Sequence, residues 1–458
     1  MPATMLPTTP EYYCFLVVVF LVFWLVRQSR AASLVVVCAA NLFFFAHAGL
    51  AYLALVPAAS GLDFLIGREL GKAQGAVLRK LLVFCSILIN VGLIVTTKYA
   101  GGGFLTLSLS FYAFQALTYT IDIYRNDSKP AASYWPYLAS VSFFPTVLAG
   151  PITRVSSIVS QWNRKDAILS GEEGSRALFL IGLGLLKKFM IADYLGTNLV
   201  NRVFDLPTLY SGGDVLVAVY AYAFQLYYDF SGYSDIAVGA GLLLGIRLPV
   251  NFNAPYTALN ITDFWNRWHI SFSKWLREYL YFSLPGPRTK VMPYVNLVVT
   301  MAIGGLWHGV GWTFLIWGLI HGTALAGFRF WQLWRKGRDS APLSLARRFA
   351  GGLLTFHVVL FAWIFFRAAN LETVTKILGQ IGSLRSLHVS FDNSSPAFLF
   401  VLAGGAAVHF IPKNWYDGSV TGFSRAPALL QAAALELVVV AIRYVGAAGA
   451  APFIYSKF

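Results

Sequence analysis

Apolar runs recur along the chain from Tyr12 onward, and no long polar segment interrupts them. Only 12% of the residues are charged, whereas a soluble domain carries about 25%. A chain of this kind is expected to fold within a lipid bilayer, where helices satisfy the hydrogen bonds of their own backbone. The pattern therefore predicts an all-α polytopic membrane protein. Without a polar insert, we expect a single membrane-embedded domain over residues 1–458.

The apolar runs differ in length, and several are shorter than the ~20 residues that cross a bilayer upright. Short runs are expected to form re-entrant or membrane-plane helices that other helices enclose. We therefore expect about 10–12 transmembrane helices together with several shorter elements. The first run, Tyr12–Val26, lacks the basic n-region and the cleavage site of a signal peptide, so we expect a retained helix.

Positive charge is abundant, with a net charge of +15, and it gathers in short segments. The clearest of these are Arg335–Arg338 and Arg347–Arg348. Membrane proteins concentrate Lys and Arg in cytoplasmic loops beside anionic lipid, so this part of the chain is expected to face the cytoplasm. No compact basic motif indicates nucleic acid as a partner, and the bilayer is the partner that we expect for these residues.

His308 lies inside an apolar run, Ile303–Val310. Between Val291 and Phe328 the chain carries no Asp, Glu, Lys or Arg and only one other histidine. An ionisable side chain at membrane depth costs a few kcal/mol and usually faces a cavity or a partner. His308 is therefore a candidate functional residue.

The chemistry available to His308 is that of a general base. A neutral imidazole near pH 7 can take the proton of an alcohol as it attacks an acyl carbonyl. Gly304, Gly305 and Gly309 are expected to keep the backbone narrow, so that a substrate chain can approach the ring. Other chemistries lack their motifs: the sequence has no Gly-x-Ser-x-Gly elbow near a histidine, no His-Glu-x-x-His and no metal-ligand spacing of cysteines. We expect no metal site.

A second Trp-His pair, Trp268-His269, lies 39 residues before His308 in the more polar segment Asp263–Tyr279. Aromatic residues recur there at helical spacing, which predicts one amphipathic helix with Asn260 or Thr262 as its N-cap. In such a helix His269 lies at the edge of the aromatic face. Two histidines from segments of such different character can bracket a chemical step, if the fold brings them together.

Each of these residues also has a structural interpretation. A membrane histidine such as His308 can simply bind a backbone carbonyl of a neighbouring helix, and His269 can serve as a cap or an interfacial anchor. Packing is the favoured interpretation of His321. For Asp229 we favour pairing with Arg or with backbone donors over catalysis, and clustered Trp and Tyr are often interfacial belts.

Several motifs in this region resemble the signature of the membrane-bound O-acyltransferases, in the order and spacing of that family. They are Tyr228-Asp229-Phe230-Ser231-Gly232-Tyr233-Ser234-Asp235, Asn251-Phe252-Asn253-Ala254-Pro255-Tyr256, Phe264-Trp265-Asn266-Arg267-Trp268-His269-Ile270-Ser271 and Gly305-Leu306-Trp307-His308-Gly309. The resemblance extends over about residues 99–367 and is closest to the bacterial branch that O-acetylates alginate and other exopolysaccharides. The D-alanyl transferase of teichoic acids is related. The chain departs from the alginate pattern at 284–288.

The resemblance implies a ring of tilted helices around a central tunnel that crosses the membrane. His308 matches the family's invariant histidine and is expected to be the catalytic base. His269 matches the second signature position and is expected to orient or polarise a substrate. Residues of the same motifs that are expected along the tunnel are Trp265, Asn266, Arg267, Trp268, Ser271, Asn251, Asn253, Trp307, Asp229 and Tyr233.

The resemblance also implies the substrates and the place of the reaction. The donor is expected to be acyl-CoA, most simply acetyl-CoA, or an acyl-carrier thioester, and no bound cofactor is expected. The acceptor is expected to be a hydroxyl of an exported cell-envelope polysaccharide, with periplasmic or extracellular acetylation proteins as partners. The expected location is the cytoplasmic (inner) membrane.

Three other functions remain open at this point. D-alanyl transfer to teichoic acid uses the same chemistry on a different acyl group. A transporter that moves a glycan or lipid without covalent chemistry is disfavoured by the absence of an internal repeat. A scaffold for other envelope proteins would not need His308 at all.

Overall fold

The computed structural model describes residues 5–99, 103–147, 149–162, 169–286, 289–336, 344–383 and 387–445. Within these ranges the chain forms helices and no strand, which confirms the all-α prediction. Two of the segments singled out from the sequence lie partly outside the described residues. The parts outside are residues 337 and 338 of the basic segment, and residues 287 and 288 of the segment that departs from the alginate pattern.

The N-terminal half contains the helices α1 (Pro10–Leu25), α2 (Arg30–Ala48), α3 (Tyr52–Lys72), α4 (Ala76–Tyr99), α5 (Gly103–Arg125), α6 (Tyr134–Val141), α7 (Phe144–Val147), α8 (Val155–Trp162), α9 (Gly171–Leu186), α10 (Asn201–Asp205) and α11 (Gly212–Leu243). The C-terminal half contains α12 (Ile261–Trp265), α13 (Ile270–Trp275), α14 (Met292–His308), α15 (Trp312–Lys336), α16 (Leu345–Arg367), α17 (Leu371–Gly382), α18 (Pro396–His409), α19 (Lys413–Arg425) and α20 (Ala428–Val445).

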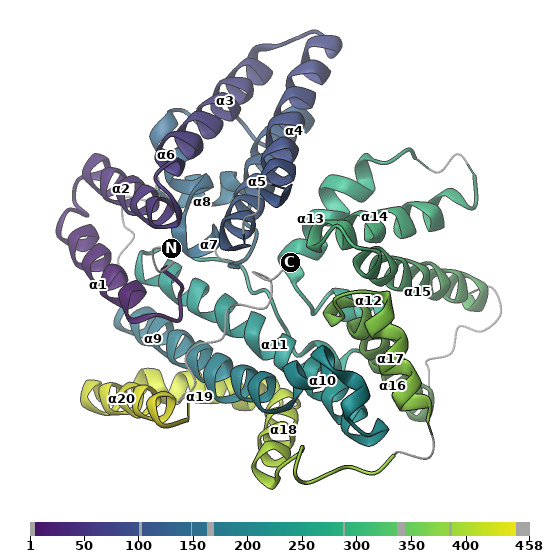
Figure 1. The fold of residues 1–458 in the computed structure, drawn as a ribbon. Helices are drawn as coiled ribbons and strands as arrows, with labels where there is room; N and C mark the ends of the chain where they lie inside the picture. The colour runs from purple at the N-terminus through teal and green to yellow at the C-terminus, as the bar shows by residue number, and fades with distance from the viewer. Residues whose placement is uncertain are drawn as a thin grey trace.

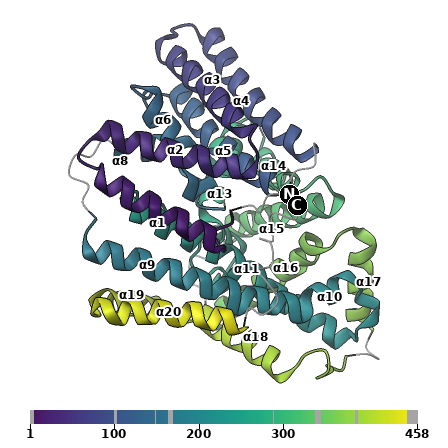
Figure 2. The same ribbon diagram turned by 60° about the vertical axis from the view of Figure 1, so that its left-hand side comes forward.

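Helix α11 forms the middle of the molecule. It begins at Ser211, whose side chain accepts a hydrogen bond from the Asp214 amide, and most of its 32 residues are buried. Figures 1 and 2 show α9 beside it, with α19 and α20 on the far side of α9. The N-terminal helices α1–α5 lie to one side of α11 and α14–α16 to the other (Figure 1). A helix enclosed in this way can carry polar residues at membrane depth, because protein surrounds them.

Three described helices are long and apolar enough to cross a membrane by length and composition: 30–48, 76–96 and 345–367. The pair α18 and α19, bent by 94°, adds a fourth if it forms one span. Length and apolar composition identify helices that face lipid. An enclosed helix such as α11 can be less apolar, because protein rather than lipid surrounds it. The apolar helices agree with a membrane protein, while the number of spans, 10–12, and the central tunnel stay predictions.

Candidate active site

His308 is the last residue of α14, which packs along α15. Glycine permits this close packing, because a Cβ added at Gly305 would collide with the backbone oxygen of Phe314. A Cβ at Gly309 would collide with the Phe314 ring. The prediction that these two glycines leave room for a substrate chain is therefore wrong, since α15 fills the space beside them.

The imidazole of His308 is buried in an enclosure of aromatic rings that four helices contribute. Its ring centroid lies 4.6 Å from that of Trp307, 5.0 Å from Phe366, 5.2 Å from Trp317 and 5.7 Å from Phe272. The rings of Trp317 and Phe366 meet it edge to face. Electrostatic interactions between this imidazole and a reacting group are stronger here than in water, because the rings keep bulk solvent away.

The segment that carries His269 does not form the single helix that its aromatic spacing predicts. It divides into α12, which ends at Trp265, and α13, which begins at Ile270. His269 stands at the break with φ 39° and ψ 56°, in the left-handed region that side chains other than glycine rarely occupy. Consequently Trp265 and His269 are not neighbours on one helix face. The predicted N-cap is confirmed for Asn260, whose side chain accepts from the Asp263 amide.

Hydrogen bonds to a distant segment replace those of a continuous helix. The Ile270 amide donates to the Asn251 carbonyl at 2.9 Å, and the Asn253 amide donates to the Arg267 carbonyl at 2.9 Å. The Asn251 side chain also accepts from the Ser271 hydroxyl at 2.9 Å. These backbone groups would otherwise bond within a helix, so the extended segment at 251–253 determines where α12 ends and α13 begins.

The break places the His269 ring among phenylalanines. It lies 4.6 Å from the Phe230 ring and is stacked on Phe272 at 5.0 Å. Phe272 also contacts His308, so the two histidines share one aromatic neighbour. The Nε2 atom of His269 is buried without a hydrogen-bond partner among the described residues. Such a group is expected to bind a polar atom of a substrate or a water molecule, because an unpaired buried polar atom is costly.

The predicted residues Asn251 and Ser271 form further hydrogen bonds that stabilise the break at His269. The Asn251 amide donates to the Ser234 hydroxyl at 3.1 Å, and the Ser271 hydroxyl accepts from the Ile152 amide at 2.9 Å. Ser271 is thereby bonded both to the segment after α7 and to the segment before α12. The network joins four parts of the sequence at the break beside His269: the segment after α7, α11, the segment before α12 and the start of α13.

Arg267 and Trp268 have partners around α12 and on α16. The Arg267 guanidinium donates to the Asp263 carboxylate at 2.8 Å and to the Thr257 hydroxyl at 3.2 Å. Trp268 is buried, with its ring centroid 4.9 Å from that of Trp363. The geometry gives both residues a packing role around α12.

Asp229 and Tyr233 belong to a buried ion cluster on α11. The Lys188 ammonium lies 2.6 Å from the Asp229 carboxylate and 2.7 Å from that of Asp193, and it lies 5.7 Å from the Tyr233 ring centroid. Asp229 therefore pairs with a lysine, where the sequence favours pairing with an arginine or with backbone donors. Lys188 and Asp193 were not singled out from the sequence. A lysine in the apolar run 175–192 was a usable signal, because ionisable residues at membrane depth usually have a function.

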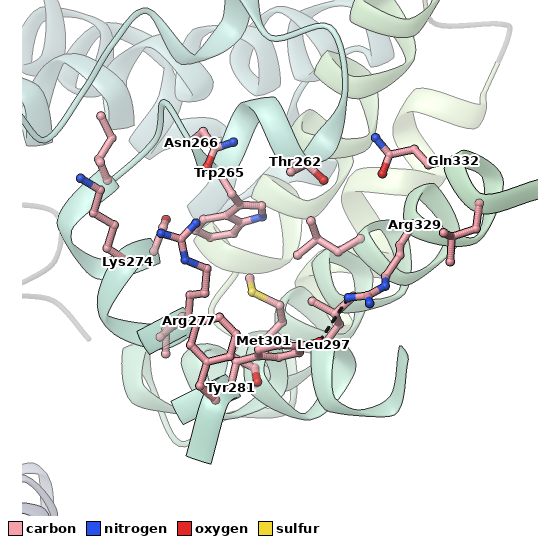
Figure 3. A pocket seen from close by; sticks show the side chains of 17 residues that line it. Thr262, Trp265, Asn266, Lys274, Arg277, Tyr281, Leu297, Met301, Arg329 and Gln332 are labelled. Carbon is pink, nitrogen blue, oxygen red and sulfur yellow. Dashed lines mark hydrogen bonds between the residues drawn. The ribbon is translucent and has the colours of Figure 1, made fainter. Parts of the chain in front are cut away.

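A cavity of about 830 Å³ opens between the α12–α13 segment, α14 and α15. Figure 3 shows Lys274 and Arg277 on one side, Arg329 on the other, and Trp265 with Met301 between them. Asn266 lies at the rim, and no acidic residue lines the cavity. The cavity is thus cationic at its rim and mostly apolar further in.

An aromatic layer separates this cavity from His308. The ring of Trp265, which lines the cavity, lies 5.9 Å from that of Trp317, and Trp317 contacts His308. His321 lies in the same layer, 4.9 Å from Trp317 and 5.1 Å from Trp265. The Nε1 atom of Trp265 and both ring nitrogens of His321 are buried without a partner among the described residues. The layer therefore has polar groups available between the cavity and the enclosure.

No group of three or more His, Cys, Asp or Glu among the described residues is placed to hold a metal ion. The site therefore consists of two buried imidazoles, their aromatic enclosure and the neighbouring cationic cavity. Such a site can accept a proton and exclude water.

Comparison with known proteins agrees with this chemistry. Residues 129–373 match the sequence model of MBOAT, the membrane-bound O-acyltransferase family. The peptidoglycan O-acetyltransferase of Helicobacter pylori is 36% identical over 389 residues, which cover 75% of this chain and 72% of the relative. A protein named probable alginate O-acetylase from Pseudomonas putida is 35% identical over 77% of this chain and 75% of its own length. The teichoic acid D-alanyltransferase of Bacillus subtilis is 29% identical over 57% of this chain and 68% of its own length.

The family match covers more than half of the chain and includes both histidines and the aromatic residues around them. The prediction of one domain over the whole chain is not tested by it. The chain belongs to the membrane-bound O-acyltransferase family and is an O-acyltransferase.

Proposed function

We propose that the protein transfers an acetyl group from a cytoplasmic thioester donor to hydroxyls of an exported cell-envelope polysaccharide, with His308 as the general base. The observation that carries the proposal is the pair of buried imidazoles that both contact Phe272. Two groups are needed in acyl transfer, one to take the proton of the acceptor and one to orient the reacting atoms. His308 and His269 are assigned these two roles.

The reaction balances with His308 as the only proton carrier. The acceptor hydroxyl gives its proton to the imidazole as its oxygen forms a bond with the acyl carbon. The carbon–sulfur bond then breaks, and the departing thiolate takes the proton from the imidazolium. His269 is assigned the role of binding a polar atom of one substrate through its Nε2 atom. The aromatic enclosure limits hydrolysis of the donor, because water is kept from the acyl carbon.

We assign the donor to the cavity beside Trp265. Lys274, Arg277 and Arg329 supply positive charge at its rim, which suits the phosphate of a CoA or carrier-protein thioester. Arg329 is 12 residues from Trp317 on α15, roughly 18 Å along the helix axis. A donor bound by its phosphate at the rim needs a long extended arm to reach His308, and phosphopantetheine provides such an arm.

The cationic rim and the basic end of α15 lie at the same end of that helix. Basic residues favour the cytoplasmic side, so the donor is expected to enter from the cytoplasm of a bacterial inner membrane. The acceptor is then expected from the opposite side, where accessory periplasmic or extracellular proteins complete the transfer onto the polymer. No bound cofactor has a part in this scheme, since the donor itself carries the activated acyl group.

Replacing Arg277 with glutamine is expected to raise the KM for the thioester donor about tenfold and to leave kcat nearly unchanged. The reason is the loss of one charge-assisted contact to a phosphate, worth about 1.4 kcal/mol at an exposed position. Initial rates against donor concentration in proteoliposomes measure both constants. Arg425→Gln on α19 is the matched control, because this exposed arginine does not line the cavity. A fall in kcat with KM unchanged would contradict the assignment of the cavity to the donor.

The acetyl group is favoured over D-alanine because the acetyltransferase relatives match more of the chain at higher identity. Mass spectrometry of the modified polymer separates the two, since an alanyl ester contains nitrogen and an acetyl ester does not. An acceptor that carries new alanyl esters would replace acetylation with the alternative. An acceptor that crosses the membrane without gaining any ester would favour a transporter.

A further inference from the structure

A second large cavity lies on the opposite face of α15, between this helix, α16 and the segment before α12. It has a volume of about 1260 Å³. Helix α15 therefore separates it from the cavity assigned to the donor, because the two cavities use different faces of the helix. Neither histidine of the candidate active site lines it.

The two ends of this groove differ in chemistry. Arg335, Arg347 and Arg348 line one end, together with Trp331 and Trp334, and no acidic residue lines the groove. The Arg335 guanidinium lies 5.8 Å from the centre of the Trp331 ring. Clustered arginine beside tryptophan is typical of the level of lipid headgroups on the cytoplasmic side.

The other end of the groove is apolar. Ala324 and Gly327 on α15 face Leu354 and Val358 on α16. From Ala324 to Arg335 the rise along α15 is roughly 16 Å, and the antiparallel α16 covers the same distance from Arg347 to Val358. Half of a bilayer's hydrocarbon core is about 15 Å thick. The groove thus matches one leaflet in both length and polarity.

We propose that this groove binds an anionic phospholipid of the cytoplasmic leaflet. The phosphate binds to Arg335, Arg347 and Arg348, and one acyl chain lies along the apolar part between α15 and α16. The inner wall is formed by Leu259, Asn260 and Ile261, where α12 begins. Helix α16 approaches this wall so closely that a Cβ at Gly351 would lie 2.8 Å from the Leu259 carbonyl oxygen. The bound lipid therefore contacts the segment that leads into α12 and His269.

The test compares phosphatidylglycerol with phosphatidylcholine of identical acyl chains, by native mass spectrometry of the purified protein. The wild-type protein is expected to retain phosphatidylglycerol in preference. The double variant Arg347→Gln/Arg348→Gln is expected to lose that preference by roughly 10- to 30-fold, from the loss of two cationic contacts. Arg27→Gln/Arg30→Gln, which removes the same charge elsewhere, is expected to keep it.

A second variant tests the apolar half of the groove. The Cβ position at Gly327 has nothing within 4 Å, so Gly327→Leu places its side chain toward the groove from an open position and is expected to fold. It should lower retention of both lipids. Gly404→Leu on α18, whose Cβ position is equally open, is the control and should change neither.

The result that overturns the proposal is equal retention of both lipids by the wild-type protein, or retention that Arg347→Gln/Arg348→Gln leaves unchanged. Displacement of phosphatidylglycerol by inorganic phosphate or by CoA at similar concentrations would also overturn it, because the groove would then bind a soluble phosphate. None of these outcomes depends on acyl transfer, so the lipid site and the proposed function are tested separately.

Discussion

Replacing His308 with alanine is expected to lower the rate of acyl transfer about 10²- to 10⁴-fold, the usual contribution of a general base. The four rings that surround the imidazole, those of Trp307, Trp317, Phe366 and Phe272, carry no basic group. The rate is measured as acyl groups transferred per protein in proteoliposomes with a saturating thioester donor. Saturation separates loss of the base from loss of donor binding.

Two further variants keep this result interpretable. His308→Gln retains a polar side chain and fills most of the space, so it should fold like the wild-type protein and be as inactive as His308→Ala. His357→Gln is the matched control, because this α16 histidine bonds to the Tyr220 hydroxyl and stands outside the enclosure. Wild-type turnover by His308→Gln would exclude the general-base role of His308. An inactive His357→Gln would show that the loss of activity does not require a histidine inside the enclosure.

Replacing Lys188 with methionine is expected to destabilise the protein by about 3–5 kcal/mol, the cost of removing one partner from a buried ion pair. The ammonium contacts the carboxylates of Asp229 and Asp193, and its loss leaves the buried Asp229 and the partly buried Asp193 without this cation. Because α11 runs through the middle of the fold, the effect should appear as a lower midpoint of global thermal unfolding in detergent. The measurement is that midpoint with and without the substitution.

The double variant Lys188→Met/Asp229→Asn identifies the cause. It should recover part of the lost stability, because the neutral amide no longer needs a counter-charge at this depth. Lys72→Met removes a lysine from the exposed pair with Glu69 and should leave the midpoint unchanged. If the double variant is no more stable than Lys188→Met, the electrostatic explanation fails and the loss belongs to packing.

The helical fold and the segments that carry the site could be predicted from local sequence, because apolar periodicity and an isolated histidine at membrane depth are visible in a single run. The partners of these segments could not. Phe366 lies 58 residues after His308 and Lys188 lies 41 residues before Asp229, and nothing in either local pattern indicates these contacts. Phe314, which fills the space beside Gly305 and Gly309, is close to them in sequence, but the local pattern does not show that α15 packs back along α14.

The segment around His269 shows the division most clearly. The aromatic spacing, the histidine and two candidate N-caps, Asn260 and Thr262, can be read from the sequence, and the structure selects Asn260. The break in the helix depends on a distant segment, because the backbone at 251–253 forms hydrogen bonds that a continuous helix would have kept within itself. That exchange turns His269 toward Phe272 and so toward His308. Local propensity determines which segments form helices, and hydrogen bonds between distant segments determine which side chains come into contact.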